Sequence, residues 1–181
     1  MRGINKRIVG VIAVLTVTAS LALASGEPQG EFRPQLMEKV RKELVTLPYY
    51  GVFDNLAFKV NGNTVTLYGH VTRPTTRSDA QRRVQRIEGV GRVINEIEVL
   101  PLSRFDDQIR ARVYRSVFSR GGLHRYARGA NPSIHIIVKN GRVTLEGVVS
   151  NESDRRLAYI AANSVPGVFS VTNNLRTSMR S

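Results

Sequence analysis

Side chains that carry out acid–base, nucleophilic or metal chemistry are few in this sequence, and they are scattered. The three histidines, His70, His124 and His135, lie on separate segments without metal-ligand spacing. Asp106 and Asp107 stand at the start of an expected helix, where carboxylates cap the chain and oppose the helix dipole. The chain has no cysteine, which excludes disulfides, thiolate metal sites and cysteine catalysis. No phosphate loop, dinucleotide fingerprint or Gly-x-Ser-x-Gly motif is present. The sequence therefore predicts a protein that is not an enzyme and needs no cofactor or metal.

The residues best suited to binding a partner are arginines. Residues 119–132 form a long, glycine-rich segment with three arginines, one histidine and no acid, and long loops in compact domains are usually functional or disordered. Arg112 and Arg115, on the solvent-facing side of the helix expected before this segment, can lie next to these loop arginines. We predict one basic patch that comprises Arg112, Arg115, Arg120, Leu123, Arg125, Tyr126 and Arg128. A solvated loop without a partner is the alternative for this composition.

The positive charge is concentrated in the C-terminal half of the chain. Residues 25–101 hold 11 basic and 9 acidic side chains, whereas residues 102–181 hold 13 and 5, a net charge of +8. Such a field attracts anionic membranes, nucleic acid or acidic polysaccharides. No aromatic-and-basic sheet motif of the RNA-binding kind is present, and the leader described below argues for export, so nucleic acid is not expected as a partner. An arginine-rich chain without a site is the competing interpretation.

The elements that position these residues occur twice. Residues 60–71 read Val-Asn-Gly-Asn-Thr-Val-Thr-Leu-Tyr-Gly-His-Val, and residues 138–149 repeat this pattern. Asn-Gly between alternating apolar runs is a strong hairpin signal. What both copies share is best explained by the fold. These shared structural residues are Asn61, Gly62, Gly69, Gly89, Asn95, Asn140, Gly141, Gly147, Gly167 and Asn173.

Each copy reads as helix, strand, strand, helix, strand, which predicts an α+β protein of two tandem αββαβ units. The helical crossover makes the third strand parallel to the second, giving a three-stranded mixed sheet. Both helices are expected on one sheet face. The other face is expected to be bare and available for contact; its outward residues are Tyr68, His70, His135, Ile137, Glu146 and Val148.

Local signals make more specific expectations. Pro34 suits the first turn of a helix, and Ser78 with Gln81 forms a capping box at the start of another. Apolar spacing places Phe105 and Leu157 in the core of the second unit. Gly69 and Gly147 lie on the core side of their strands, where a larger side chain is expected to strike the helix above.

The beginning of the chain reads as an export signal. Residues 1–24 combine a basic start, an apolar run and a small-x-small end, which predicts a cleaved signal peptide, with a retained anchor as the alternative. A linker at 25–33, units at 34–101 and 104–177 and a tail at 178–181 follow. Only residues 101–103 join the units, so we expect a fixed contact between them. Export predicts a protein of the periplasm or cell envelope.

Asn-Gly, then Val-Thr-Leu-x-Gly-x-Val, a helix, Gly-Val and a final Val-x-Asn resembles the BON domain, which is named for bacterial osmotic-shock and nodulation proteins. Both copies carry this resemblance, over residues 34–177. It implies envelope proteins that associate with membranes, bind phospholipid or assist other envelope proteins under stress. We therefore expect the basic second unit to associate with anionic phospholipid. A periplasmic protein-interaction or chaperone-like module is the alternative.

Overall fold

A computed structural model describes residues 29–120, 123–129 and 131–178 of the chain. The predicted signal peptide at 1–24, the start of the predicted linker at 25–33 and the end of the predicted tail at 178–181 lie outside the described residues. The first unit consists of α1 (Gln29–Val45), β1 (Asn55–Asn61), β2 (Thr64–Val71), α2 (Pro74–Gln85) and β3 (Arg92–Val99). The second consists of α3 (Arg104–Arg115), a π-helical turn η1 (Ser116–Arg120), a 3-10 turn η2 (His124–Ala127), β4 (Ile134–Lys139), β5 (Arg142–Val149), α4 (Glu152–Asn163) and β6 (Ser170–Thr177).

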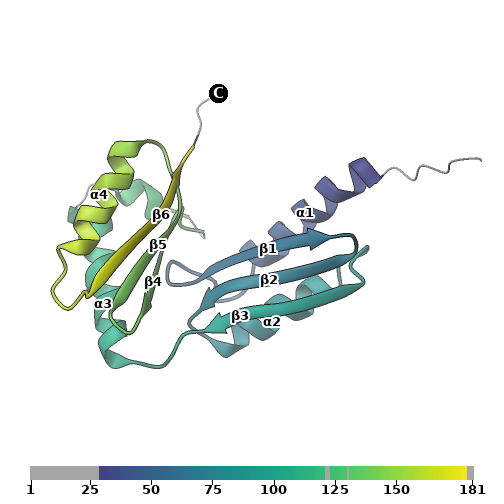
Figure 1. Cartoon of the computed structure of the whole chain (residues 1–181), viewed down its shortest axis with the longest axis horizontal. Helices are drawn as coiled ribbons and strands as arrows, with labels where there is room; N and C mark the ends of the chain where they lie inside the picture. Colours follow the sequence, from purple (N-terminus) through teal and green to yellow (C-terminus); the bar gives the residue numbers. More distant parts are fainter. Residues whose placement is uncertain (1–28, 121–122, 130, 179–181) are drawn as a thin grey trace, which may run out of the picture.

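Each unit contains one three-stranded sheet whose central strand is the second in chain order. β2 pairs antiparallel with β1 and parallel with β3, and β5 pairs with β4 and β6 in the same way. Two helices cover one face of each sheet (Figure 1). The predicted α+β class and the tandem αββαβ units are therefore confirmed.

The central strands bury the side chains that their alternation predicts. Every second residue of β2 and β5 faces the helices; the buried apolar members are Val65, Leu67, Val71, Val143, Leu145 and Val149. α1 and α3 complete the cores with apolar residues at helical spacing, such as Leu36, Val40, Ile109 and Val113.

Two residues of the second unit that were predicted to be buried are not. Phe105 is 53% exposed and Leu157 is 43% exposed. α4 turns Ala158 and Ala162 toward the sheet instead, and these small side chains let the helix lie close to the strands. Leu157 is left on the flank of the helix as a consequence.

Two predicted helix starts are also wrong. α2 begins at Pro74, whose fixed φ suits the first helical position, so Ser78 lies inside the helix and its hydroxyl donates to the Pro74 carbonyl. Gln81 accepts a hydrogen bond from Asn95 rather than completing a capping box. α1 begins at Gln29, so Pro34 lies within the helix and not in its first turn. Pro34 is the sixth residue of α1, so it removes the amide that would bond the carbonyl four residues earlier.

Gly69 and Gly147 lie on the core side of their strands with φ of +119° and +123°. A side-chain carbon on Gly147 would overlap the carbonyl oxygen of Ser133 and lie 3.0 Å from its carbonyl carbon. Gly69 meets Asn55 in the same manner. The expectation that a helix is the obstacle is therefore wrong, because the backbone entering the neighbouring antiparallel strand occupies this space.

The loop before β1 joins the first unit to the second. The Ile136 amide in β4 donates to the Val52 carbonyl at 2.7 Å, and Nδ1 of His135 lies 3.2 Å from the Gly51 carbonyl. Val52 and Phe53 pack against the core of the second unit. Figure 1 shows this loop beside β4. Backbone and side chains of the first unit thus hold the edge of the second sheet.

This contact covers part of the sheet face that was predicted to be bare. His135 and Ile137 are buried, and the ring of Tyr50 lies 5.5 Å from that of His135. Burial raises the pKa of Tyr50 to about 12. Lys139 also reaches Glu98 of β3 at 2.5 Å and thereby lowers the pKa of that carboxyl. The bare-face prediction is therefore wrong at β4.

We expect Gly147→Ala to destabilise the protein by about 1–3 kcal/mol, because β4 and β5 must separate to admit the methyl group and the positive φ is strained for alanine. Thermal unfolding measures the loss. Gly51→Ala is the matched control, since a side-chain carbon at Gly51 has no neighbour within 4 Å. Equal losses from the two changes would contradict the packing described for Gly147.

The stability of the unit contact should fall on mild acidification. Burial lowers the pKa of His135 below its usual 6.5, so the unfolded chain binds this proton first as pH falls, and stability is lost between 6.5 and the lower folded value. We expect His135→Asn to weaken this dependence in urea unfolding between pH 7 and 5. An unchanged pH slope would show that His135 does not cause it.

Candidate functional site

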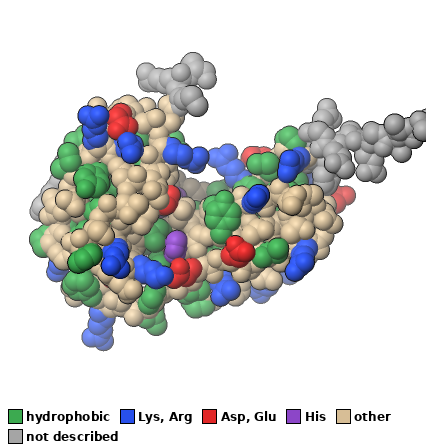
Figure 2. All heavy atoms as spheres, viewed as in Figure 1, with side chains coloured by type: hydrophobic (Ala, Val, Ile, Leu, Met, Phe, Trp, Pro, Cys, Tyr) green, Lys and Arg blue, Asp and Glu red, His purple; other side chains and the backbone are tan. Residues whose placement is uncertain are grey.

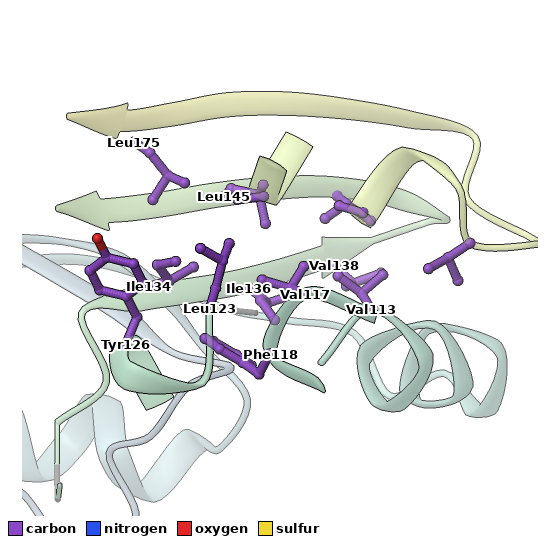
Figure 3. Close-up of a cluster of buried hydrophobic side chains, with 14 of the residues drawn as sticks. Val113, Val117, Phe118, Leu123, Tyr126, Ile134, Ile136, Val138, Leu145 and Leu175 are labelled. Atoms are coloured by element: carbon purple, nitrogen blue, oxygen red, sulfur yellow. The ribbon is translucent and has the colours of Figure 1, made fainter. Parts of the chain in front are cut away.

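The structure divides the basic patch that the sequence predicts. Leu123 and Tyr126 are only 1% and 7% exposed, and Figure 3 shows both pointing toward the strands among Ile134 and other core residues. The prediction that both side chains belong to an exposed basic patch is therefore wrong for this fold. The long loop folds back as η2 because Leu123 and Tyr126 complete the core of the second unit.

Tyr126 also carries a polar network at the start of α4. Its hydroxyl donates to Asp154 at 2.5 Å and accepts from the Ser150 amide at 2.8 Å. Arg125 pairs with the same carboxylate and lies over the Tyr126 ring. Burial alone raises the pKa of Asp154, but the bonds from Tyr126 and Arg125 outweigh it, so the pKa is lowered. Arg125 therefore has a structural partner.

Arg112 and Arg115 lie near the opposite end of α4. They line a groove between α3 and the end of α4 with Ser116, Ser119, Ser164, Val165 and Pro166, and Arg112 donates to the Pro166 carbonyl at 3.4 Å. Asp154 and Asn163 lie nine residues apart in α4, about 14 Å along the helix axis, and Pro166 follows the end of the helix. The arginines are thus not one cluster. Arg128 is exposed beyond η2, and the side chain of Arg120 lies outside the described part of the chain.

Beside Arg112 lie exposed aromatic rings that the sequence analysis did not assign to a site. Phe105 and Phe169 flank a shallow hollow with Gly141, Arg142 and Gly167. The sequence contains a signal for this site, because Phe169 and Arg142 of the second copy stand where the first copy has Gly91 and Thr64. A large ring and a positive charge added in one copy only indicate a surface that the other copy lacks. Figure 2 shows basic and apolar side chains interspersed over the second unit, on the left.

The residues that both copies share lie in turns and in contacts between strands and helices. Asn95 donates to the Arg77 carbonyl at 3.2 Å, and Asn173 donates to the Arg155 carbonyl at 2.9 Å, which ties each third strand to the helix before it. Both amide oxygens accept the backbone N–H two residues onward. The turn residues with positive φ are Gly62, Gly89, Asn140, Gly141 and Gly167, and Asn61 ends β1.

The histidines remain apart. His70 lies 3.4 Å from Glu98, His135 is buried at the unit contact, and His124 is exposed in η2. Within residues 29–120, 123–129 and 131–178, no three His, Asp or Glu side chains are grouped to hold a metal ion. Among the described helices, none has the length and apolarity needed to cross a bilayer.

Comparison with known proteins identifies a family. The BON domain model matches residues 35–101 and 105–179. No curated protein matches the chain. One similar solved structure is CdsD, a structural protein of the type III secretion system of Chlamydia trachomatis, at 12% identity and a TM-score of 0.31, covering 80% of this chain and 94% of that one. A structure of the C-terminal domain of CdsD is similar at 14% identity and a TM-score of 0.29, covering 80% of this chain and 98% of that one.

Tyr126→Phe should destabilise the second unit by about 1–3 kcal/mol, because the change leaves the Ser150 amide and the Asp154 carboxylate short of a partner. Thermal unfolding measures this effect. Tyr159→Phe, at an exposed position of α4, is the matched control. A loss of stability no larger than that of the control would contradict a structural role for the hydroxyl.

Proposed function

This chain belongs to the BON domain family, and on that premise we propose that its second unit associates with membrane surfaces that contain anionic phospholipid. The contact is electrostatic at first encounter and uses the arginines of α3. The protein acts in the cell envelope after export and catalyses no reaction.

The proposal rests on the lack of acidic partners at Arg112 and Arg115. Neither forms an ion pair with a described acidic residue, and the same holds for Arg104, Arg128, Arg142 and Arg176 of the second unit. Arg110 pairs with Asp107, and Arg155 pairs with Glu152. Apart from the bond from Arg112 to the Pro166 carbonyl, these arginines keep their N–H donors for phosphate oxygens, which the planar guanidinium matches well.

The alternative is a module that meets other proteins through bare sheet faces. The loop of residues 50–54 and the Lys139–Glu98 pair already occupy part of that surface, which favours the lipid proposal. Leu157 and Ile160 on α4 are exposed apolar residues that a protein partner could cover. Binding to a protein is therefore the other outcome of the test below.

The test is co-sedimentation of the exported chain with vesicles of phosphatidylcholine alone or mixed with phosphatidylglycerol. We expect binding to the anionic vesicles only, with partial release as salt screens the charges. Each basic residue near an anionic leaflet contributes about 1 kcal/mol. Replacing Arg112 and Arg115 with serine should therefore weaken binding by about 2 kcal/mol, or roughly 30-fold.

Arg77→Ser with Arg86→Ser is the matched control, because both arginines are exposed in the first unit, Arg77 on α2 and Arg86 at the C-cap of this helix. The control pair should change binding much less. Equal losses from the two pairs would show that net charge alone decides binding, and absence of binding by the unchanged protein would reject the lipid proposal in favour of a protein partner.

A further inference from the structure

We infer that the second unit enters the lipid interface through one end, the aromatic tip, formed by Phe105, Gly141, Arg142, Gly167 and Phe169. Exposed Leu102 lies three residues before Phe105 in the chain and is counted with the tip. This inference rests on the proposed function and adds the part of the surface that inserts. In Figure 1 the tip is the lower end of the second unit, where the loop between α4 and β6 lies.

The tip exposes large apolar side chains. Leu102 is 98% exposed, Phe169 is 76% exposed, and Phe105 is 53% exposed. Single exposed apolar residues are common on protein surfaces, but a group of them marks a contact site. Phe105 and Phe169 line the same hollow, so their exposure is a local feature of the second unit.

The platform under the rings is rigid. A side-chain carbon on Gly167 would lie 3.4 Å from the ring of Phe105, and one on Gly141 would lie 3.6 Å from it. The ring of Phe105 therefore lies close over the two turns that contain Gly141 and Gly167. The buried carboxylate of Asp106 accepts from the amides of Asn140 and Gly141 at 2.9 and 2.8 Å, which fixes the β4–β5 turn beneath. Insertion therefore requires no ordering of this turn.

The first unit has the same backbone without this surface. The Phe169 amide donates to the Gly141 carbonyl at 2.8 Å, and the Gly91 amide donates to the Asn63 carbonyl at the same distance. A side-chain carbon on Gly91 would strike the Asn63 side chain, whereas Gly141 leaves room for Phe169 in the second unit. Room alone does not require a large ring that is 76% exposed, and a contact made by the second unit alone does explain it.

The charges around the tip select an anionic lipid surface as the occupant. The Arg142 guanidinium lies 5.2 Å from the centre of the Phe169 ring, and Arg112 reaches the Gly167–Pro166 turn from the other side. The acidic residues that begin α3 are engaged, since Asp107 pairs with Arg110 and Asp106 binds backbone amides. Rings flanked by free arginines match the boundary where anionic headgroups meet acyl chains.

The sequence has no tryptophan, so Phe169→Trp places a single fluorescent reporter at the tip. With vesicles of phosphatidylglycerol and phosphatidylcholine we expect its emission to shift to the blue, with quenching by lipids brominated on the acyl chains. Tyr49→Trp is the matched control, because Tyr49 is 68% exposed in the first unit and Arg73 lies 4.6 Å from its ring centre. Its emission should not change.

The outcomes separate this inference from the proposed function. Co-sedimentation of both tryptophan variants without a blue shift of Phe169→Trp would reject insertion of the tip and leave lipid association intact. Absence of co-sedimentation would reject both. An equal shift of the two reporters would reject the tip as a site, and a blue shift that grows with protein concentration in the absence of vesicles would assign the tip to a second copy of the chain.

Phe169→Ser should weaken anionic vesicle binding by roughly 10-fold or more if the ring inserts.

Discussion

Each three-stranded sheet carries helices on one face only, so its other face must be wetted or covered by another part of the protein. In the second unit the first unit supplies that cover at β4, through the Val52–Ile136 backbone bond and the burial of His135 and Ile137. The contact joins the units beside a junction of three residues, 101–103. Because one sheet edge and part of one face are engaged, the exposed helices and the aromatic tip remain for an external partner.

The sequence predicts the fold well because the signals that determine it are local and occur twice. Asn-Gly turns with alternating apolar residues define both hairpins, and the helix after each hairpin requires a parallel third strand. The shared Asn95 and Asn173 repeat the same bonds to helix carbonyls. Such pairs are recognisable without coordinates, since each residue has a counterpart at the same place in the other copy.

The surface is less predictable, because burial depends on how elements turn and on what crosses over them. Leu123 and Tyr126 belong to a loop whose composition suggests exposure, yet they complete a core that α4 fills only with alanines on that side. Phe105 stands at helical spacing with Ile109 and Val113, yet it lies past the edge of the sheet and rests on Gly141 and Gly167. Because Leu123 and Tyr126 are buried and Phe105 is exposed, the apolar part of the candidate site lies at the tip and not in the long loop.

On this view the second unit meets anionic lipid at its tip and through Arg112 and Arg115 in the last turn of α3, while the first unit faces away. Hydrogen–deuterium exchange of the protein with phosphatidylglycerol-containing vesicles tests this claim most directly. We expect slower exchange at residues 102–105, 112–115, 140–142 and 166–170, with α2 and β3 unchanged. Slower exchange over α2, or an exchange pattern identical with and without anionic vesicles, would contradict it.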